Sequence, residues 1–450
     1  KNNFKVDKIL IDRTIVSFTV VLNLINQSPF LGIKVKNPIH MAAAETDWSQ
    51  LPGELLDLIS KHLPSEVDLL RFRSVCATWR SSVPRPSPSP SRFPILPNAG
   101  ISDTTWGFYL SKRTIYCLQN PETPLTKAWV IKLERDHPDR THLLNPLTRS
   151  QFRPLPHNFP RRFDFSNMRV RELGCEFALQ YINYRPSASS LLGDAGNLYM
   201  EKVAFSANRQ GEGFVLLTIH VSGKLVLHKS GDTKWTVIPD LPSPYDDVIF
   251  HQGNFYAVDN TGRLVMVDLN PGSIPGVSAV AGSIFGGDKK FLVESCGDLV
   301  LVDMYLSVGP EDDLGYNEAL EFYEEFDCFM SERTVKFKVF RLDRGRERWV
   351  EVSHLGDTIL CLGDNCTFAA SASELNFPGQ GNCILFTDQF FHDREDDGGS
   401  KGNGIGVFDL ESGSIGPITS YQGYSESFWP PPAWVYPPSA VEDWLEELSV

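Results

Sequence analysis

Apolar residues first recur at helical spacing shortly before residue 60. Turn-forming and capping residues occupy positions 47–54, and Pro64 ends the pattern. The apolar positions between them are Leu55, Leu56, Ile59 and Leu63. A second helical stretch opens at Ser65, with the apolar markers Val67, Leu70, Val75 and Trp79. The pattern predicts roughly 35 residues of short helices, too few to bury a substantial core alone. Such a unit either caps a larger domain or docks on a partner.

Beyond residue 100 the pattern changes to short apolar runs bounded by turn residues. Turn-forming residues such as 230–232 and 259–262 separate runs rich in β-branched and aromatic side chains. The runs predicted as strands are 106–110, 114–118, 127–133, 213–221, 247–258, 289–293, 335–342 and 383–387. This part of the chain is therefore predicted to be mainly β.

The predicted strands contain an internal repeat. Gly223, Gly262 and Gly297 each open the pattern glycine, polar residue, Leu-Val and an apolar residue, at spacings of 39 and 35 residues. Trp235 and Trp349 open similar phrases 114 residues apart, which would equal three periods of 38. Such periods are typical of β-propeller blades, and about 340 residues at roughly 45 per blade give six or seven blades. The alternative is a large irregular β fold with chance similarities.

Two further segments lie outside the predicted helices and strands, one between the two regions and one before them. Residues 81–97 hold six prolines and five serines, which favours an extended spacer over the alternative of an SH3 or WW ligand. Near the N-terminus, twenty uncharged residues lie between Arg13 and Lys34, but polar residues at 23–28 interrupt them. Met41 begins a sequence typical of a protein start. We therefore expect residues 1–40 to be a non-native leader or a disordered segment outside the fold, with a targeting or anchor segment as the alternative.

The net charge, the cysteine content and the missing catalytic motifs argue against several classes of function. The formal net charge of −14 argues against broad binding to nucleic acid or anionic membranes, because both require clustered lysine and arginine. Eight cysteines without CxxC spacing indicate a reducing compartment and no zinc site. Nucleophile-elbow, HExxH, P-loop and kinase motifs are all missing from the sequence. We expect no catalytic residue, metal or cofactor.

The helical segment resembles the F-box. The resemblance covers about residues 48–82, from Leu51-Pro52 to the closing Val75-Cys76-x-x-Trp79-Arg80. It implies a three-helix module that binds the Skp-type adaptor of an SCF ubiquitin ligase, a form of helix-in-groove recognition. By resemblance the docking face would comprise Leu51, Pro52, Leu55, Leu56, Ile59, Leu63, Val75, Cys76 and Trp79. Some of these residues must instead form the internal core, and the sequence does not divide the two sets.

The β region extends this resemblance. Asn145-Pro146-Leu147-Thr148-Arg149, followed by Leu155-Pro156, is similar to a phrase of plant F-box proteins with kelch-like C-terminal domains. Residues 235–242, 247–259 and 429–434 resemble the plant group with a KIB-like domain. The resemblance implies an α+β multidomain protein: a small three-helix F-box, then a mainly-β, kelch-like domain, favoured as a β-propeller of six or seven blades. The expected divisions are a leader at 1–40, F-box at 47–82, Pro/Ser-rich linker at 83–99, β-propeller-like domain at 100–438 and tail at 439–450.

Family membership implies a substrate receptor in the cytoplasm or nucleus. Its partners would be the Skp-type adaptor, a cullin held through that adaptor and an unknown client protein, with no nucleic acid or membrane. One alternative is a scaffold or competitor that binds the adaptor but delivers no client. A second alternative is a propeller enzyme that carries an incidental helical cap.

Two charged stretches bear on client binding. Residues 311–327 hold eight acidic and no basic side chains, and the aromatic residues Tyr316, Phe322, Tyr323 and Phe326 lie among them. Aromatic anchors within a field of carboxylates suit a basic client, while the alternative is a solvated insertion. Residues 332–348 then carry seven basic against three acidic side chains on a predicted hairpin, where neighbouring charges would neutralise one another. A further acidic cluster at 393–397 is predicted to be a loop tip without metal-ligand spacing.

Overall fold

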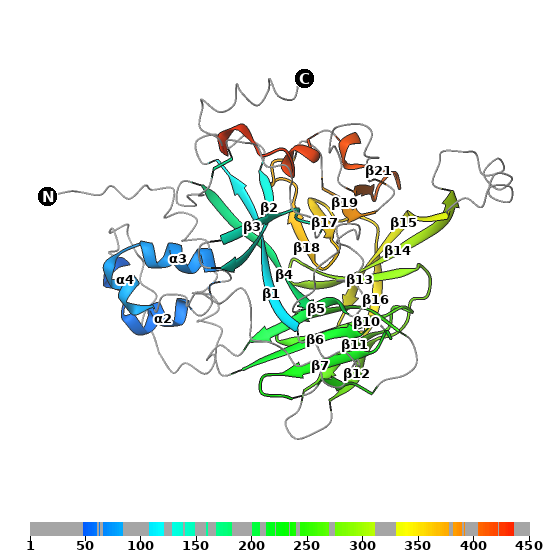
Figure 1. Ribbon diagram of the computed structural model, residues 1–450, viewed down its shortest axis with the longest axis horizontal. Helices are drawn as coiled ribbons and strands as arrows, with labels where there is room; N and C mark the ends of the chain where they lie inside the picture. The colour runs from blue at the N-terminus through cyan, green and yellow to red at the C-terminus, as the bar shows by residue number, and fades with distance from the viewer. Residues whose placement is uncertain are drawn as a thin grey trace. The chain divides into compact units, whose positions relative to one another are not determined.

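The computed structural model divides into two compact units, Lys1–Ser89 and Pro90–Val450 (Figure 1). It describes residues 48–60, 63, 66–83, 108–120, 128–137, 140–148, 159–160, 168–181, 200–207, 213–220, 222–233, 235–239, 244–269, 275–310, 330–377, 381–388, 391, 404–421 and 423–435. The predicted leader, nearly all of the linker and the predicted tail lie outside these residues.

The first unit is helical, as the sequence pattern predicts. Its elements are the 3-10 turn η1 (Trp48–Gln50) and the helices α2 (Gly53–Ser60), α3 (Glu66–Ser74) and α4 (Ala77–Ser82). The carbonyl of Pro52 accepts the N–H groups of Leu55 and Leu56, which starts α2 at the predicted place. Cys76 caps α4, since its sulfur accepts the N–H of Trp79 at 3.5 Å.

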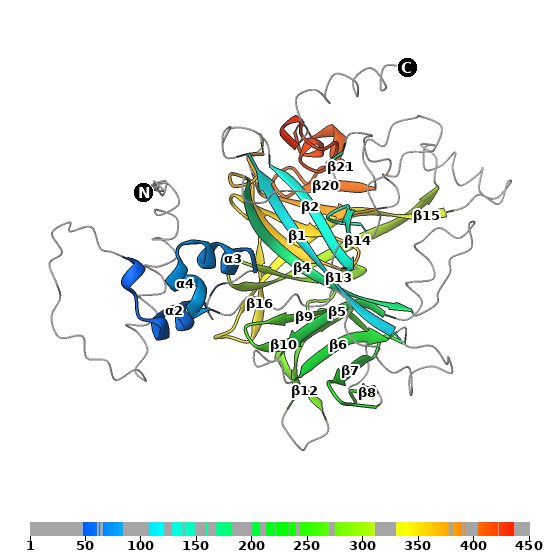
Figure 2. The ribbon, with the colours of Figure 1, turned by 60° about the vertical axis from the view of Figure 1, so that its left-hand side comes forward.

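The described part of the second unit consists of mainly antiparallel sheets (Figures 1 and 2). The first eight strands are β1 (Phe108–Gln119), β2 (Trp129–His137), β3 (Arg140–Leu144), β4 (Arg169–Tyr181), β5 (Met200–Ala207), β6 (Phe214–His220), β7 (Leu225–Lys229) and β8 (Thr236–Val237). They form one sheet in the order β3-β2-β1-β4-β5-β6-β7-β8, but β4 and β5 join through the single pair Phe177 and Val203. This sheet is therefore two four-stranded groups.

The other strands form three more groups. The third holds β9 (Tyr245–His251), β10 (Asn254–Asp259), β11 (Leu264–Asp268) and β12 (Gly276–Ala281), and the fourth β13 (Lys289–Ser295), β14 (Asp298–Pro310), β15 (Met330–Asp343) and β16 (Arg348–Val352). The fifth holds β17 (Thr358–Leu362), β18 (Thr367–Ser371), β19 (Cys383–Thr387), β20 (Ile405–Asp409) and β21 (Ile415–Pro417), with β17 parallel to β19. Three 3-10 turns follow, η5 (Ile418–Ser420), η6 (Ser425–Ser427) and η7 (Ala433–Val435).

The five groups follow one another in a cycle. One strand of each group lies beside one strand of the next, in the order β4, β5, β9, β13, β18 and back to β4. An apolar cluster lies between each group and the next, and the fifth cluster lies between the fifth group and the first. Each group thus buries both faces against its neighbours, as propeller blades do. The prediction of a small helical module followed by a mainly-β, propeller-like domain is confirmed.

The described strands form five groups, fewer than the six or seven blades expected from chain length. Trp235 and Trp349 show the reason. Both lie at or directly before the fourth strand of a group, β8 and β16, but those groups are the second and the fourth. The interval of 114 residues therefore spans two groups and not three periods of 38. Long strands and insertions make each group larger than the repeat suggested.

The glycine repeat marks hairpin turns. Gly223, Gly262 and Gly297 have φ values of +76°, +87° and +83°, a conformation that glycine adopts without strain. The first two precede the third strands β7 and β11 of their groups, so they are equivalent positions. Gly297 instead precedes β14, the second strand of its group. All three glycines of the repeat therefore form the same kind of turn, but only Gly223 and Gly262 hold equivalent positions within their groups of strands.

Candidate functional site

The helical module has a small apolar core. The fully or nearly buried residues are Leu56, Ile59, Phe72, Trp79 and Val83. The rings of Phe72 and Trp79 lie 4.4 Å apart between centroids and join α3 to α4. Three of the nine residues predicted for the docking face, Leu56, Ile59 and Trp79, therefore form this core.

The other six predicted residues lie nearer the surface. Pro52 and Val75 are exposed, with 47% of Val75 accessible to solvent. Leu51, Leu55, Leu63 and Cys76 are half-buried. Leu70, which the sequence pattern predicts only as an apolar position of the helix, is also 46% exposed. Its neighbour Leu69 packs against the core, whereas Leu70 lies about 100° further around the helix and is exposed. The sequence carries no signal that separates these two leucines, because both fit an apolar helix face.

Arginine side chains fix the α3–α4 hairpin. Arg73 donates from Nη1 to the carbonyl oxygens of Arg80, at 3.0 Å, and Val83. Arg80 donates from Nε to the carbonyl oxygen of Arg73 at 3.3 Å. The exposed apolar residues Leu70 and Val75 therefore lie on a well-defined scaffold, a condition for helix-in-groove binding with little ordering cost.

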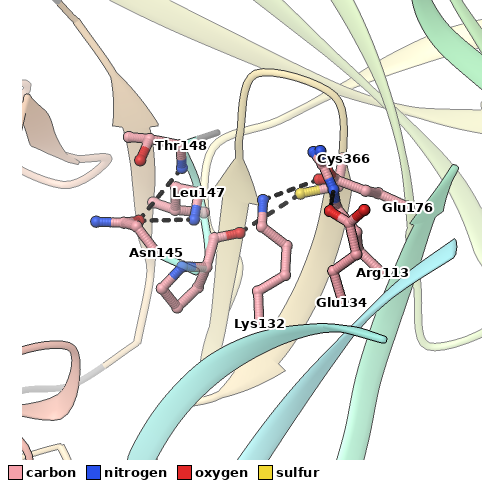
Figure 3. Close-up of polar contacts among 9 residues, drawn as sticks. Arg113, Lys132, Glu134, Asn145, Leu147, Thr148, Glu176 and Cys366 are labelled. Carbon is pink, nitrogen blue, oxygen red and sulfur yellow. Dashed lines mark hydrogen bonds and ion pairs between the residues drawn. The ribbon is translucent and has the colours of Figure 1, made fainter. Parts of the chain in front are cut away.

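In the β domain, the phrase that begins at Asn145 forms a turn that joins the first group to the fifth (Figure 3). Asn145 Oδ1 accepts the N–H groups of Leu147 at 2.9 Å and Thr148 at 3.2 Å. The turn then contacts the β17–β18 hairpin: Cys366 Sγ donates to the carbonyl oxygen of Pro146, and Asp364 N–H to that of Leu147 at 2.9 Å. This motif therefore closes the cycle of groups and has a structural role.

Beside this turn lies a buried set of four charges (Figure 3). Lys132 Nζ is 2.9 Å from Glu176 Oε2, and both side chains are fully buried. Arg113 bridges the two carboxylates, at 2.7 Å to Glu176 Oε1 and 2.7 Å to Glu134 Oε2. Burial opposes ionisation of Glu176, but the positive charges of Lys132 and Arg113 lower its pKa to about 2. Two positive and two negative groups balance one another, so the set is a structural ion network.

Lys202 connects four groups. It extends from β5, and its Nζ donates to Asp247 Oδ2 of β9 at 2.9 Å, the Leu292 carbonyl of β13 at 3.3 Å and Thr367 Oγ1 of β18 at 2.8 Å. Asp247 is buried and also accepts the N–H of Leu292 at 2.7 Å. All three ammonium donors are used, so these contacts stabilise the arrangement of groups and leave Lys202 no free donor for a ligand.

Comparison with known proteins agrees with this architecture. Residues 48–88 match the F-box domain, and residues 107–409, well over half of the chain, match the KIB1-4 beta-propeller. The chain belongs to the F-box proteins with a KIB1-4 beta-propeller domain. This confirms the predicted family.

This chain is similar to curated relatives along nearly their full length. "F-box protein SKIP23" of Arabidopsis thaliana is 46% identical over 417 residues, which cover 90% of this chain and 99% of the relative. "F-box protein At2g17036" of the same plant is 36% identical over 422 residues, 90% of this chain and 98% of the relative. "Putative F-box/kelch-repeat protein At5g24040" is 28% identical over 403 residues, 86% and 98%.

For an F-box protein, the module implies a Skp-type adaptor as partner, and the family consists typically of substrate receptors. The predicted client-binding residues Tyr316, Phe322, Tyr323 and Phe326 lie outside the described residues, as does the acidic cluster at 393–397. The structure therefore leaves both as predictions.

Reactive cysteines, metal-binding groups and membrane-spanning helices can also be assessed in the described part of this F-box protein. Burial raises the thiol pKa to about 11 for Cys117 and about 12 for Cys383, so neither is a nucleophile at neutral pH. Within the described ranges, no group of three His, Cys, Asp or Glu side chains is placed to hold a metal ion. Nor does any helix there have the length and apolar character to cross a membrane.

Proposed function

We propose that this F-box protein is the substrate receptor of an SCF-type ubiquitin ligase, with the helical module on a Skp-type adaptor and the β domain on the client. The observation that carries the proposal is the pairing of an F-box module, with apolar residues left exposed, and a separately packed propeller domain. Two binding sites on one chain raise the effective concentration of client lysines near the ubiquitin carrier. The transfer chemistry belongs to other subunits, reached through the cullin, and the protein acts in the cytoplasm or nucleus.

The burial pattern refines the proposed docking face. Pro52, Val75 and Leu70 contact the adaptor directly, because they are the most exposed apolar residues of the module. Leu51, Leu55, Leu63 and Cys76 border that surface, while Leu56, Ile59 and Trp79 hold its shape from beneath. Binding would cover apolar surface that the module alone leaves in water.

Adaptor co-purification tests the proposal. The double variant Leu51→Ala with Pro52→Ala should lose the adaptor, because deletion of each apolar contact at an interface typically costs about 1 kcal/mol or more. The melting transition of the β domain should stay within about 1 °C of wild type, because the substitutions lie in the other compact unit. A matched control is Val237→Ala, an exposed apolar residue of the β domain.

The outcomes separate the possible functions. Undiminished adaptor binding by the double variant would refute the F-box docking face. If the wild-type chain recovers adaptor and cullin but no ubiquitylated client under proteasome blockade, the protein is a scaffold or competitor. Failure of the wild-type chain to bind any Skp-type adaptor would refute the receptor function and favour the propeller enzyme.

A further inference from the structure

Along its outer edge, the strand β15 has a stretch that no other described strand pairs with. On one side it pairs with β14 over Met330–Arg341, but on the other it pairs with β16 only from Val339 to Asp343. Both β14 and β15 extend together past the end of β16 (Figures 1 and 2). Thr334 donates its N–H to Asp388 Oδ2 at 2.9 Å, so this main-chain donor of β15 already has a partner. No described strand pairs with the outer edge of residues 335–338.

The chain after β16 leaves this edge. Gly356 turns with a φ of +62°, and Leu355 N–H donates to Asn382 Oδ1 at 2.8 Å. These contacts direct the chain to β17 in the next group. Among the described residues, no strand occupies the place that a longer β16 would take.

A groove of about 430 Å³ lies along this open edge. One wall is residues 335–339 of β15, and the other is the turn after β20, at 410–413. Its apolar lining includes Phe337 and Phe408, whose rings lie 5.3 Å apart between centroids and belong to the cluster between the fourth and fifth groups. Val335, at a bulge in the pairing with β14, is 43% exposed beside it.

The opposite face of the same edge is basic. Alternation along β15 places Lys336 and Lys338 on the face opposite Phe337. Lys336 Nζ lies 5.9 Å from the ring centre of Tyr305, and neither lysine forms an ion pair among the described contacts. Glu351 and Glu411 also line the groove: Glu351 pairs with Phe340 at the end of β16, on the same face as the two lysines, and Glu411 is on the facing wall. Among residues 335–338, the charged side chains directly beside an added strand are the two lysines, which outnumber the one glutamate on their face.

We propose that the outer edge of β15 at residues 335–338 binds an extended segment of the client, which adds as a strand in line with β16 and alternates apolar with acidic side chains. Main-chain hydrogen bonds to an open sheet edge supply affinity, and alternate side chains supply specificity. The apolar side chains lie toward Phe337 and Phe408, and the acidic side chains lie beside Lys336 and Lys338. This inference rests on the proposed receptor function and names the recognition element that such a client carries.

Lysines on an open edge can have another purpose, because they discourage edge-to-edge aggregation. That purpose needs no groove and no apolar lining, and it predicts no binding of short peptides. The two explanations therefore differ in a direct binding measurement.

The experiment uses the full chain and three fluorescein-labelled peptides of eight residues, read by fluorescence anisotropy. The first peptide alternates valine and glutamate, and the second alternates valine and lysine. The third repeats the first with alternate amides methylated, which removes main-chain donors but keeps every side chain. The valine–glutamate peptide should bind, and the other two at least about tenfold more weakly.

Two protein variants locate the site. Lys336→Glu with Lys338→Glu should weaken binding of the valine–glutamate peptide about tenfold, because it reverses both charges next to the added strand. The matched control, Arg344→Glu with Arg348→Glu, makes the same change of charge in the same hairpin, beside the turn at 344–347 and away from the open edge. The control should bind as wild type.

Three results would overturn the inference: no binding of the valine–glutamate peptide, equal binding of its methylated form, or an unchanged affinity for Lys336→Glu with Lys338→Glu. Adaptor co-purification and recovery of ubiquitylated clients are measured on the same proteins. Retained adaptor and clients without peptide binding would refute this edge and leave the receptor function standing. Loss of adaptor by the wild-type chain would refute the receptor function itself.

Discussion

The helical module and the β domain bury their apolar residues in different ways. The module has one cluster around Leu56 and Trp79 and leaves Leu70 and Val75 nearly half exposed. The described β domain has five clusters, each enclosed between two groups of strands, and its exposed large apolar residues occur singly, as at Phe285.

This difference explains how each part is suited to binding. The module has too few residues to cover its own apolar surface, so a partner can complete it. The β domain covers its apolar surface through its own cycle of groups, and it buries one ion pair inside the first group and another between the second and third groups. The proposed binding of a client by that domain would therefore use edges and loops, where polar and apolar contacts remain available.

The largest effect should follow from breaking the buried ion network of the β domain. Lys132→Met leaves Glu176 buried with only Arg113 as a partner, which should cost about 3–5 kcal/mol in the free energy of unfolding. Chemical denaturation measures it. The control is Arg171→Ala, which removes a surface ion pair with Glu374 and should cost at most about 1 kcal/mol. Similar losses for the two variants would show that the network is not structural.

The same network should make the stability of the β domain depend on acid. The pKa of Glu176 is about 2 in the folded protein against an ordinary value of 4.5. A lowered folded pKa stabilises the protein fully above pH 4.5, and this stabilisation is lost as pH falls from 4.5 toward 2. The loss should amount to about 3 kcal/mol. Denaturation at a series of pH values should show it for wild type and a flatter profile for Glu176→Gln. Parallel profiles would contradict the assignment.

Substitutions in the core of the helical module should mainly reduce its stability, whereas substitutions on its surface should mainly reduce its affinity for the adaptor. Leu56→Ala opens a cavity in a small core and should cost about 2–5 kcal/mol, enough to unfold the module. Leu70→Ser with Val75→Ser should change stability by less than about 1 kcal/mol yet reduce adaptor affinity at least about tenfold. Helical circular dichroism and adaptor titration on residues 41–89 distinguish them. Full adaptor affinity in the double variant would remove Leu70 and Val75 from the docking face.

A smaller effect is expected from the acidic segment 311–327. If its aromatic residues anchor a basic client, replacement by a short Gly-Ser loop should remove clients and leave adaptor binding intact. A second variant converts its eight acidic residues to Asn or Gln and keeps the aromatics. It should mainly slow client association and flatten its dependence on salt. Affinity mass spectrometry identifies the clients, and an unchanged client list after loop replacement would leave the segment as a solvated insertion.

The smallest effect should come from residues 1–40. A chain that starts at Met41 should purify and bind adaptor as the full chain does, because these residues are predicted to lie outside both folded parts. Membrane fractionation in carbonate is the measurement that decides the alternative. Tight pelleting that disappears on removal of residues 1–40 would show that they are an anchor.

The sequence by itself determined the local features of this protein. Apolar spacing located the helices near α2 and α3, and β-branched runs between turn residues located β1, β2, β6, β13, β15 and β19, while the run 247–258 proved to be the two strands β9 and β10. Glycines at 223, 262 and 297 marked three hairpin turns, because each turn needs a backbone conformation that only nearby residues decide. The F-box resemblance also rests on residues within one short segment.

Tertiary structure decided what depends on distant residues. The sequence recorded that Trp235 and Trp349 are 114 residues apart, but only strand pairing shows that they lie two groups apart and that five groups form the cycle. Asn145 belonged to a recognised phrase, yet the role of that turn depends on contacts with Asp364 and Cys366, more than 200 residues away. The division of the nine F-box residues into core and surface, and the open edge of β15, were also decided there. The physical reason is the same in each case: periodicity shows which face of an element is apolar, whereas packing decides what covers that face.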